Sequence, residues 1–145
     1  MLRLVAAGAA LVGVLAGAGY LPPVDAPVVD PFRPPSTPFS SGNRGLEYET
    51  VPGQAVGAVG AGEVVFAGRV GPSRHVTILH PDGLRSSYSY LDEILVVVGQ
   101  QVSTGDSVGR AGPRLHLGIR AGSAYLDPAA LFAAAAATPR LVPVR

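Results

Sequence analysis

Apolar and polar residues alternate along most of the chain after residue 42, and this two-residue period is typical of strands that bury one face. The clearest example is the segment 114–120, Arg-Leu-His-Leu-Gly-Ile-Arg, in which every second residue is apolar. Its leucines and isoleucine would face a core, whereas Arg114, His116 and Arg120 would share the opposite face. Polar side chains two residues apart on one strand face can present converging ligands or acid–base groups.

The same pattern predicts a series of further short strands. They are expected over residues 56–59, 63–68, 75–80, 84–90, 94–98 and 107–109. The turn Pro81-Asp82-Gly83 is typical of a β-hairpin. Near the end, Asp127 and Pro128 form an N-cap and a first-turn proline ahead of an Ala-rich helix over 129–137. We therefore predict an all-β fold, an antiparallel sandwich or open barrel of short strands and hairpins with a short C-terminal helix.

The beginning of the chain has a different character. A mostly apolar, uncharged run follows Arg3, and Ala16-Gly17-Ala18 fits the small-x-small cleavage pattern of a secretory signal. We expect residues 1–18 to be a signal peptide that exports the protein. The run is short for a membrane span, so only an uncleaved signal would attach the chain to a membrane.

A proline-rich segment separates this signal from the expected domain. Residues 19–41 contain seven prolines, which fix φ and remove backbone donors, so we expect an extended linker whose later part lies against the domain through Phe32. The folded domain is expected over residues 42–132, followed by the helix end and a tail over 133–145.

Composition excludes several classes of function. The net charge of +1, with no basic patch interleaved with aromatic residues, gives no case for a nucleic-acid partner. The absence of Cys excludes disulfides, thiolate zinc sites and cysteine nucleophiles. No Gly-rich loop lies between a strand and a helix, where it could cradle a phosphate.

Seven short motifs follow one another between residues 42 and 132. They are Asn43-Arg44-Gly45-Leu46-Glu47, Pro52-Gly53-Gln54-Ala55-Val56, residues 62–68, Tyr88-Ser89-Tyr90-Leu91, residues 98–109, Arg114-Leu115-His116-Leu117 and Leu126-Asp127-Pro128. In this order and spacing they resemble the motifs of the lysostaphin/LytM-type zinc metallopeptidases, the bacterial cell-wall endopeptidases. The resemblance covers essentially the whole expected domain.

The resemblance implies a zinc site with three protein ligands and an open position for water. In an active member, the ligands would be a His at position 43, an Asp at position 47 and the second His of a His-x-His pair at position 116. Histidines at positions 114 and 90 would serve the bound water and the tetrahedral intermediate.

Most of these positions are substituted here. Asn43 has a neutral amide, which is a poor zinc donor, and Glu47 is one methylene longer than Asp. Arg114 is a permanent cation that cannot act as a base, and Tyr90 does not easily shuttle protons near neutral pH. Only His116 is retained. We therefore expect no metal cofactor and no intact catalytic set, with Glu47 and His116 as the residual candidate ligands; zinc is expected only if the chain is an active enzyme.

The substituted positions are expected to line one groove. The candidate groove residues are Asn43, Glu47, Tyr88, Tyr90, Arg114 and His116. The simplest role for Arg114 is an ion pair with Glu47, and the alternative is a bidentate contact with a carboxylate of a bound peptide. The two tyrosines would pack and hydrogen-bond at the groove edge or stack on sugars.

The remaining histidines have a structural and a functional interpretation. His80 precedes a turn and is expected to be structural. A relocated zinc site of His75, His80 and His116 is the alternative, although the resemblance places these three residues far apart.

These observations favour an exported cell-envelope protein with a degenerate LytM-type domain. Such a domain would bind peptidoglycan or regulate a cell-wall hydrolase, so the expected partner is peptidoglycan or another cell-wall protein. One alternative is an active zinc endopeptidase that cleaves peptide cross-links with Glu47, His116 and a third ligand. The other is a purely structural envelope domain.

Overall fold

The computed structural model describes residues 19–137, and it confirms the predicted all-β class. The elements are β1 (Val28–Asp30), β2 (Leu46–Glu49), β3 (Ala55–Gly57), β4 (Gly62–Val70), β5 (Ser73–Leu79), β6 (Arg85–Ile94), β7 (Gln101–Val102), β8 (Ser107–Ala121), β9 (Ala124–Leu126) and α2 (Pro128–Ala137). No helix in this part of the chain is long and apolar enough to cross a membrane.

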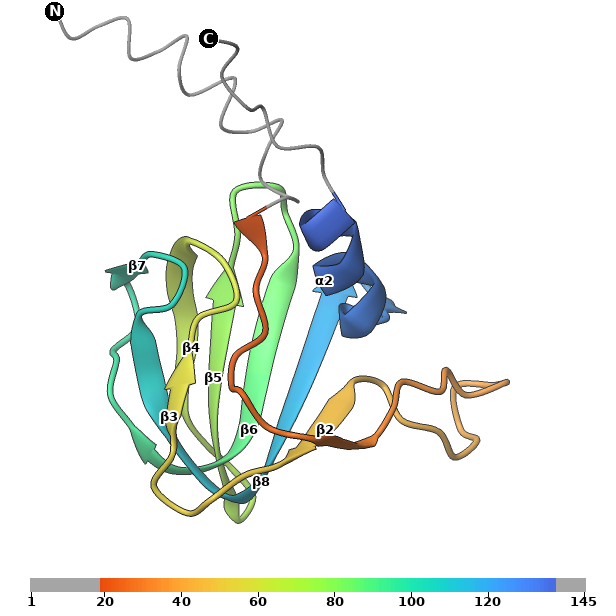
Figure 1. Ribbon diagram of the computed structural model, residues 1–145, viewed down its shortest axis with the longest axis horizontal. Helices are drawn as coiled ribbons and strands as arrows, with labels where there is room; N and C mark the ends of the chain where they lie inside the picture. The colour runs from red at the N-terminus through yellow and green to blue at the C-terminus, as the bar shows by residue number, and fades with distance from the viewer. Residues whose placement is uncertain (1–18, 138–145) are drawn as a thin grey trace, which may run out of the picture.

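The strands form one nine-stranded antiparallel sheet that is strongly curved but open (Figure 1). Its main path runs β1-β2-β8-β6-β5-β4-β7, and β3 and β9 both pair with β8. The sheet is built around β8, which at 15 residues is long enough to pair with four other strands along its length. Two of the expected short strands, 107–109 and 114–120, are therefore parts of this single strand.

The core lies on one face of the sheet, as the alternation of apolar residues requires. Leu115, Leu117 and Ile119 are fully buried there together with Val76 and Ile78 of β5. The polar residues at the intervening positions of β5, β6 and β8 consequently face the other side, and this is the side on which the pocket described below opens.

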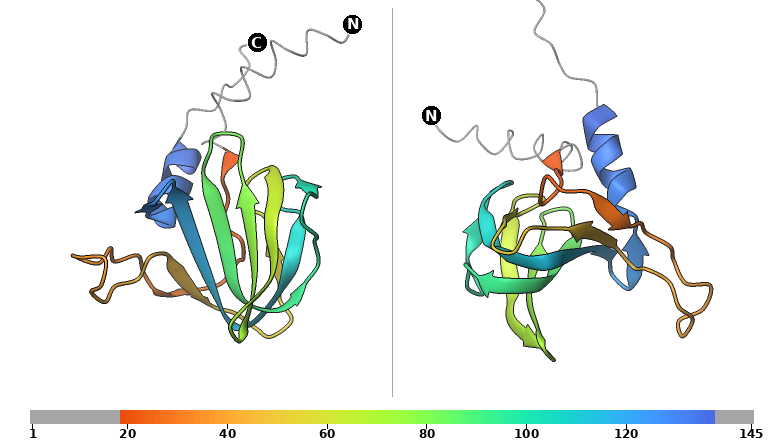
Figure 2. Two further views of the ribbon diagram at one scale, coloured as in Figure 1. Left: turned by 180° about the vertical axis from the view of Figure 1, so that it is seen from behind. Right: turned by 60° about the horizontal axis from the view of Figure 1, so that its bottom comes forward.

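Residues 19–30, expected as a linker, pack against the domain (Figure 2). The Tyr20 ring is only 2% exposed, and its hydroxyl donates to the Asp82 carboxylate at 2.9 Å. Val24 is also buried, and β1 adds to the sheet beside β2. These residues are apolar enough to supply core contacts between the prolines. Residues 34–42 instead extend away from the sheet as a loop (Figure 2).

Several local expectations can be compared with the structure. The Ala129 amide donates to Asp127 Oδ1 at 2.9 Å, so Asp127 caps α2 as the sequence predicts. The strand expected over 94–98 does not form, because β6 ends at Ile94 and the chain turns at Gly99. The sequence pattern did not predict β1, β2, β7 or β9. The predicted signal, 1–18, and residues 138–145 of the predicted tail lie outside the described residues.

Candidate functional site

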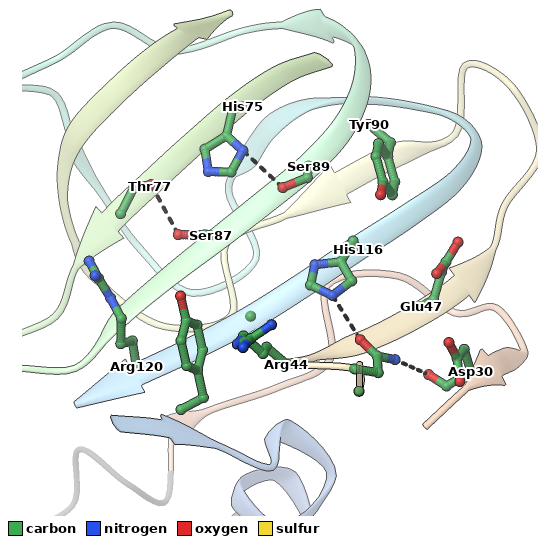
Figure 3. Close-up of a pocket in the computed structure, with 14 residues that line it drawn as sticks. Asp30, Arg44, Glu47, His75, Thr77, Ser87, Ser89, Tyr90, His116 and Arg120 are labelled. Carbon is green, nitrogen blue, oxygen red and sulfur yellow. Dashed lines mark hydrogen bonds between the residues drawn. The ribbon is translucent and has the colours of Figure 1, made fainter. Parts of the chain in front are cut away.

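A pocket of about 600 Å³ opens on the polar face of the sheet (Figure 3). It is lined by Asp30, Gly42, Asn43, Arg44, Glu47, His75, Thr77, Ser87, Ser89, Tyr90, His116, Gly118, Arg120 and Tyr125. The wall of the pocket is polar, and its residues come from β1, β2, β5, β6, β8 and β9 and from the segment before β2.

The register of the sheet arranges these side chains in rows across the strands. One row is His75, Ser89, His116 and Glu47, which are successive cross-strand partners on β5, β6, β8 and β2. The next row is Thr77, Ser87 and Gly118. Directly opposed residues on one face lie close together, so these positions, far apart in sequence, form one surface.

Asn43 is the centre of the hydrogen-bond network at one side of the pocket. Its side chain is only 6% exposed. Its Nδ2 donates to the Asp30 and Pro31 carbonyl oxygens, both at 3.0 Å. Because the two carbonyls fix the orientation of the amide, Oδ1 must act as the acceptor, and it receives the Gly45 amide at 3.2 Å and His116 Nε2 at 3.0 Å.

This network determines which nitrogen of His116 carries the proton. Asn43 Oδ1 has no hydrogen to give, so His116 Nε2 must be the donor in their bond. Burial lowers the pKa of His116, although the Glu47 and Asp30 charges act in the opposite direction. The imidazole is therefore neutral and protonated at Nε2 near pH 7, which leaves Nδ1 as its only nitrogen with a free lone pair.

Gly45 permits this arrangement. A Cβ at position 45 would lie 2.1 Å from the Leu117 carbonyl oxygen and 2.9 Å from His116 Cε1. Only glycine lets the chain entering β2 pass this close to β8 and to the imidazole.

Glu47 and Arg114 form an ion pair beside this network. Arg114 Nη1 donates to Glu47 Oε2 at 2.7 Å, and the Arg114 side chain is 53% exposed. Glu47 lines the main pocket, whereas Arg114 lies outside it and lines an adjoining shallow hollow with Glu47, Tyr90 and Pro113. The Arg114 guanidinium thus covers one side of the Glu47 carboxylate, which the sequence analysis names as a residual candidate ligand.

The two tyrosines of Tyr88-Ser89-Tyr90 separate to opposite faces, and the expected groove position of Tyr88 is wrong. Tyr88 is fully buried; its hydroxyl accepts the Val59 amide at 2.9 Å and bonds Ser86 Oγ at 2.8 Å. Tyr90 lines the pocket instead, with its ring 6.3 Å from that of His116. The register of β6 shifts between Ser89 and Leu91, and Tyr90 has a φ of 69°, so a bulge turns it to the other face.

The sequence motifs did not identify several residues as part of the pocket. His75 Nδ1 and Ser89 Oγ are 2.8 Å apart, and the Thr77 and Ser87 hydroxyls are 3.1 Å apart. Burial, with a smaller contribution from the neighbouring His116, lowers the pKa of His75. Once the hairpin register is known, these residues share the parity of His116, but the sequence alone does not give that register.

His80 has the structural role expected for it. It is 3% exposed, its Nδ1 bonds the Ala61 carbonyl at 2.8 Å and its Nε2 bonds Ser86 Oγ at 2.7 Å. Both ring nitrogens are therefore engaged on the core side of the sheet. The alternative zinc site with His75 and His116 is ruled out by this geometry, since no group of three His, Cys, Asp or Glu side chains between residues 19 and 137 could hold a metal.

Comparison with known proteins identifies the family of this fold. Residues 41–128 match the model of peptidase family M23. The chain belongs to peptidase family M23. The LytM-type resemblance inferred from the motifs is thereby confirmed.

The M23 relatives include proteins of the cell envelope. The chain is 32% identical over 114 residues to the murein hydrolase activator NlpD of Salmonella dublin, covering 73% of this chain and 29% of that protein. It is 36% identical over 101 residues to the outer membrane antigenic lipoprotein B of Haemophilus influenzae, covering 62% of this chain and 25% of the relative. The chain thus spans about a quarter of the length of these relatives.

A solved structure supports the same assignment. The zinc-containing peptidase from Vibrio cholerae superposes with a TM-score of 0.65 at 27% identity, covering 74% of this chain and 38% of the other. The open antiparallel sheet described above is therefore the M23 fold.

M23 domains are normally zinc-dependent, so the fit of this site to zinc can be tested on its own residues. Asn43 offers a neutral amide oxygen that already accepts two hydrogen bonds, and His116 Nε2 is protonated toward it. The Glu47 carboxylate is paired with a guanidinium, whose positive charge disfavours a divalent cation nearby. These residues do not fit a zinc ion.

Proposed function

We propose that this M23 domain works without zinc and without catalysis, as a module of the cell envelope that binds peptidoglycan or regulates a cell-wall hydrolase. The observation that carries the proposal is the hydrogen bond between Asn43 Oδ1 and His116 Nε2. It uses the retained histidine to hold an amide where an active enzyme of this family would hold zinc.

The positions expected to serve the catalytic water support the same proposal. Arg114 remains charged at all physiological pH values, so it can neither accept a proton nor become a metal ligand. Tyr90 can donate a hydrogen bond into the pocket, but an ordinary phenol does not exchange protons efficiently near pH 7. One nitrogen of His75 is also engaged within the sheet, since its Nδ1 lies 2.8 Å from Ser89 Oγ.

The relatives support an envelope location. One is named a murein hydrolase activator and another an outer membrane lipoprotein. The apolar run expected as a signal peptide over 1–18 agrees with export. By this proposal the chain reaches the envelope and acts there through its groove.

The groove has the chemistry of a binding site for an extended polar ligand. The rows of hydroxyl and imidazole groups on β5, β6 and β8 can exchange hydrogen bonds with amides or sugar hydroxyls. Tyr90 and Tyr125 at its edges, which are 49% and 45% exposed, offer rings for stacking.

Metal analysis and a sedimentation assay together test the proposal. The purified chain should carry no stoichiometric zinc after incubation with zinc and dialysis, and it should sediment with insoluble peptidoglycan without releasing peptides from it. Stoichiometric zinc with peptide release would instead establish the active endopeptidase. No sedimentation at low salt, together with no stimulation of a co-incubated murein hydrolase, would favour a purely structural envelope domain.

A matched pair of variants shows whether binding uses the pocket. A Cβ at Gly118 would make only ordinary contacts, 3.7 Å from the Arg44 carbonyl oxygen, so the backbone accepts a side chain there and Gly118→Val adds bulk to the pocket wall. Ala55→Val at an exposed position of β3 also introduces a valine, but away from the pocket. Gly118→Val should lose sedimentation or hydrolase stimulation, and Ala55→Val should retain it.

A further inference from the structure

Two arginines line one end of the pocket, and a third is the cross-strand neighbour of one of them. Arg85 of β6 and Arg120 of β8 are directly opposed in the sheet register, and their residues face the polar side. Arg44, from the segment before β2, lines the same pocket as Arg120, between Arg120 and His116 (Figure 3). We call Arg44, Arg85 and Arg120 the arginine cluster.

No carboxylate neutralises the arginine cluster within residues 19–137. The ion pairs of this part of the chain join Arg33 to Asp30, Arg110 to Glu93 and Arg114 to Glu47. The acidic residues that line the pocket, Asp30 and Glu47, lie at the opposite end and already have their own arginine partners (Figure 3). The uncompensated charge of the pocket is therefore positive and confined to one end.

This arrangement does not help the fold. Like charges directly opposed across two antiparallel strands are destabilising. Arg44 is nevertheless held in place, since its Nη2 donates to the Pro38 carbonyl at 3.1 Å and its guanidinium carbon lies 6.0 Å from the Tyr125 ring centroid. Tyr125 in turn is the cross-strand partner of Arg120. Tyr125 is thus in contact with the Arg44 guanidinium and lies opposite Arg120 in the sheet.

We infer that the arginine cluster is a subsite for the carboxylate of a peptide bound along the pocket, with Arg44 and Arg120 as its donors. Guanidinium forks match a planar carboxylate with two parallel hydrogen bonds. This inference rests on the proposed binding function and names the group that the pocket recognises.

The rest of the pocket favours a peptide over a polyanion. The row of Thr77 and Ser87 comes next to the arginine cluster, and the row of His75 and Ser89 follows. A peptide can place its one carboxylate at the arginines and its amides over these hydroxyl groups. A phosphate polymer would bring further negative charges beside Glu47 and Asp30, where they would be repelled.

Nuclear magnetic resonance titration of the whole chain tests the subsite. The probes are N-acetyl-D-alanyl-D-alanine, the same dipeptide with a C-terminal amide, and inorganic phosphate. The free carboxylate should shift the Arg44 and Arg120 Nε–H signals, and the amide should not. Arg120→Gln should weaken binding of the carboxylate about five-fold or more, because it removes one charge-assisted hydrogen-bonded pair. Arg69→Gln, which removes an exposed arginine from the end of β4, should leave binding unchanged.

Thermal unfolding separates recognition from folding. Removing a like charge from the opposed Arg85 and Arg120 should leave Arg120→Gln as stable as the parent or more stable, although binding falls. A less stable Arg120→Gln with unchanged binding would overturn the inference, because the arginine would then serve the fold. Equal binding of the amide, equal losses in both variants, tighter binding of phosphate or no shift with any probe would also overturn it.

The failure of this subsite is distinguishable from failure of the proposed function. If Arg120→Gln sediments with peptidoglycan as the parent does, the groove binds without this carboxylate contact and only the subsite is refuted. If the parent chain neither sediments nor stimulates a hydrolase, the proposed function itself fails.

Discussion

Replacing Asn43 with Ala should cost this domain a large part of its stability. The side chain makes four hydrogen bonds that join the end of β1, the entry to β2 and the imidazole on β8. At about 1 kcal/mol net for each bond, the upper limit is about 4 kcal/mol. Asp30 is partly exposed, so some freed groups regain water, and we expect a loss of about 2–3 kcal/mol.

Urea unfolding followed by circular dichroism measures this loss. With the m-value of a small domain, the midpoint of Asn43→Ala should fall by roughly 1–2 M. Gln54→Ala is the control, because the Gln54 side-chain amide accepts the Val51 backbone amide at 3.0 Å in a surface turn and otherwise makes only a long bond of 3.4 Å to the Asp25 carbonyl. That variant should lose less than about 1 kcal/mol. Equal midpoints for the two variants would refute the reasoning that the Asn43 side chain links these three segments.

Three further predictions follow from the same geometry. Asn43→His with Glu47→Asp and Arg114→His recreates the family's ligands and base, so this variant should bind zinc stoichiometrically by mass spectrometry where the parent does not. The three histidines have pKa values lowered by burial, so their contribution to stability is complete above their unfolded pKa of about 6.5 and is lost as the pH falls below it. Urea midpoints should therefore decrease from about pH 7.5 to about pH 5.5, and a flat profile would contradict this. Gly45→Ala places a methyl group 2.1 Å from a carbonyl oxygen and should lower the free energy of unfolding by about 2 kcal/mol or more in the same assay, whereas Gly118→Ala should be tolerated.

Local sequence patterns predicted the structural features that arise from interactions between residues close in sequence. The alternation of 114–120 is enough to place Leu115, Leu117 and Ile119 in a core, because strand geometry alone sends alternate residues to opposite faces. The cap at Asp127 likewise depends on atoms two residues apart. The order of the motifs was enough to identify the family, and the substitutions at 43, 47, 90 and 114 were visible without any coordinates.

A backbone irregularity can change the face on which a side chain lies even within a correctly predicted strand. By parity, Tyr88 and Tyr90 should share a face, but the bulge at Tyr90 sends one to the core and the other to the pocket. The packing of residues 19–30 likewise depends on contacts that are distant in sequence. The composition of this segment predicts an extended chain. Composition does not show that the Tyr20 ring packs edge-on against His80 or that its hydroxyl donates to the Asp82 carboxylate.

The sequence by itself determined the fold class, the family and the loss of the metal-binding residue types. Only the tertiary structure decided which contacts the residues at these positions make. Asn43 forms a hydrogen bond with His116, 73 residues away in sequence. Arg120 lies opposite Arg85 and Tyr125 in the sheet. Both arrangements depend on the pairing of the strands. Hydrogen-bond partners and uncompensated charges are properties of distance in space, and alternation along a chain carries no information about that distance until the strands are paired.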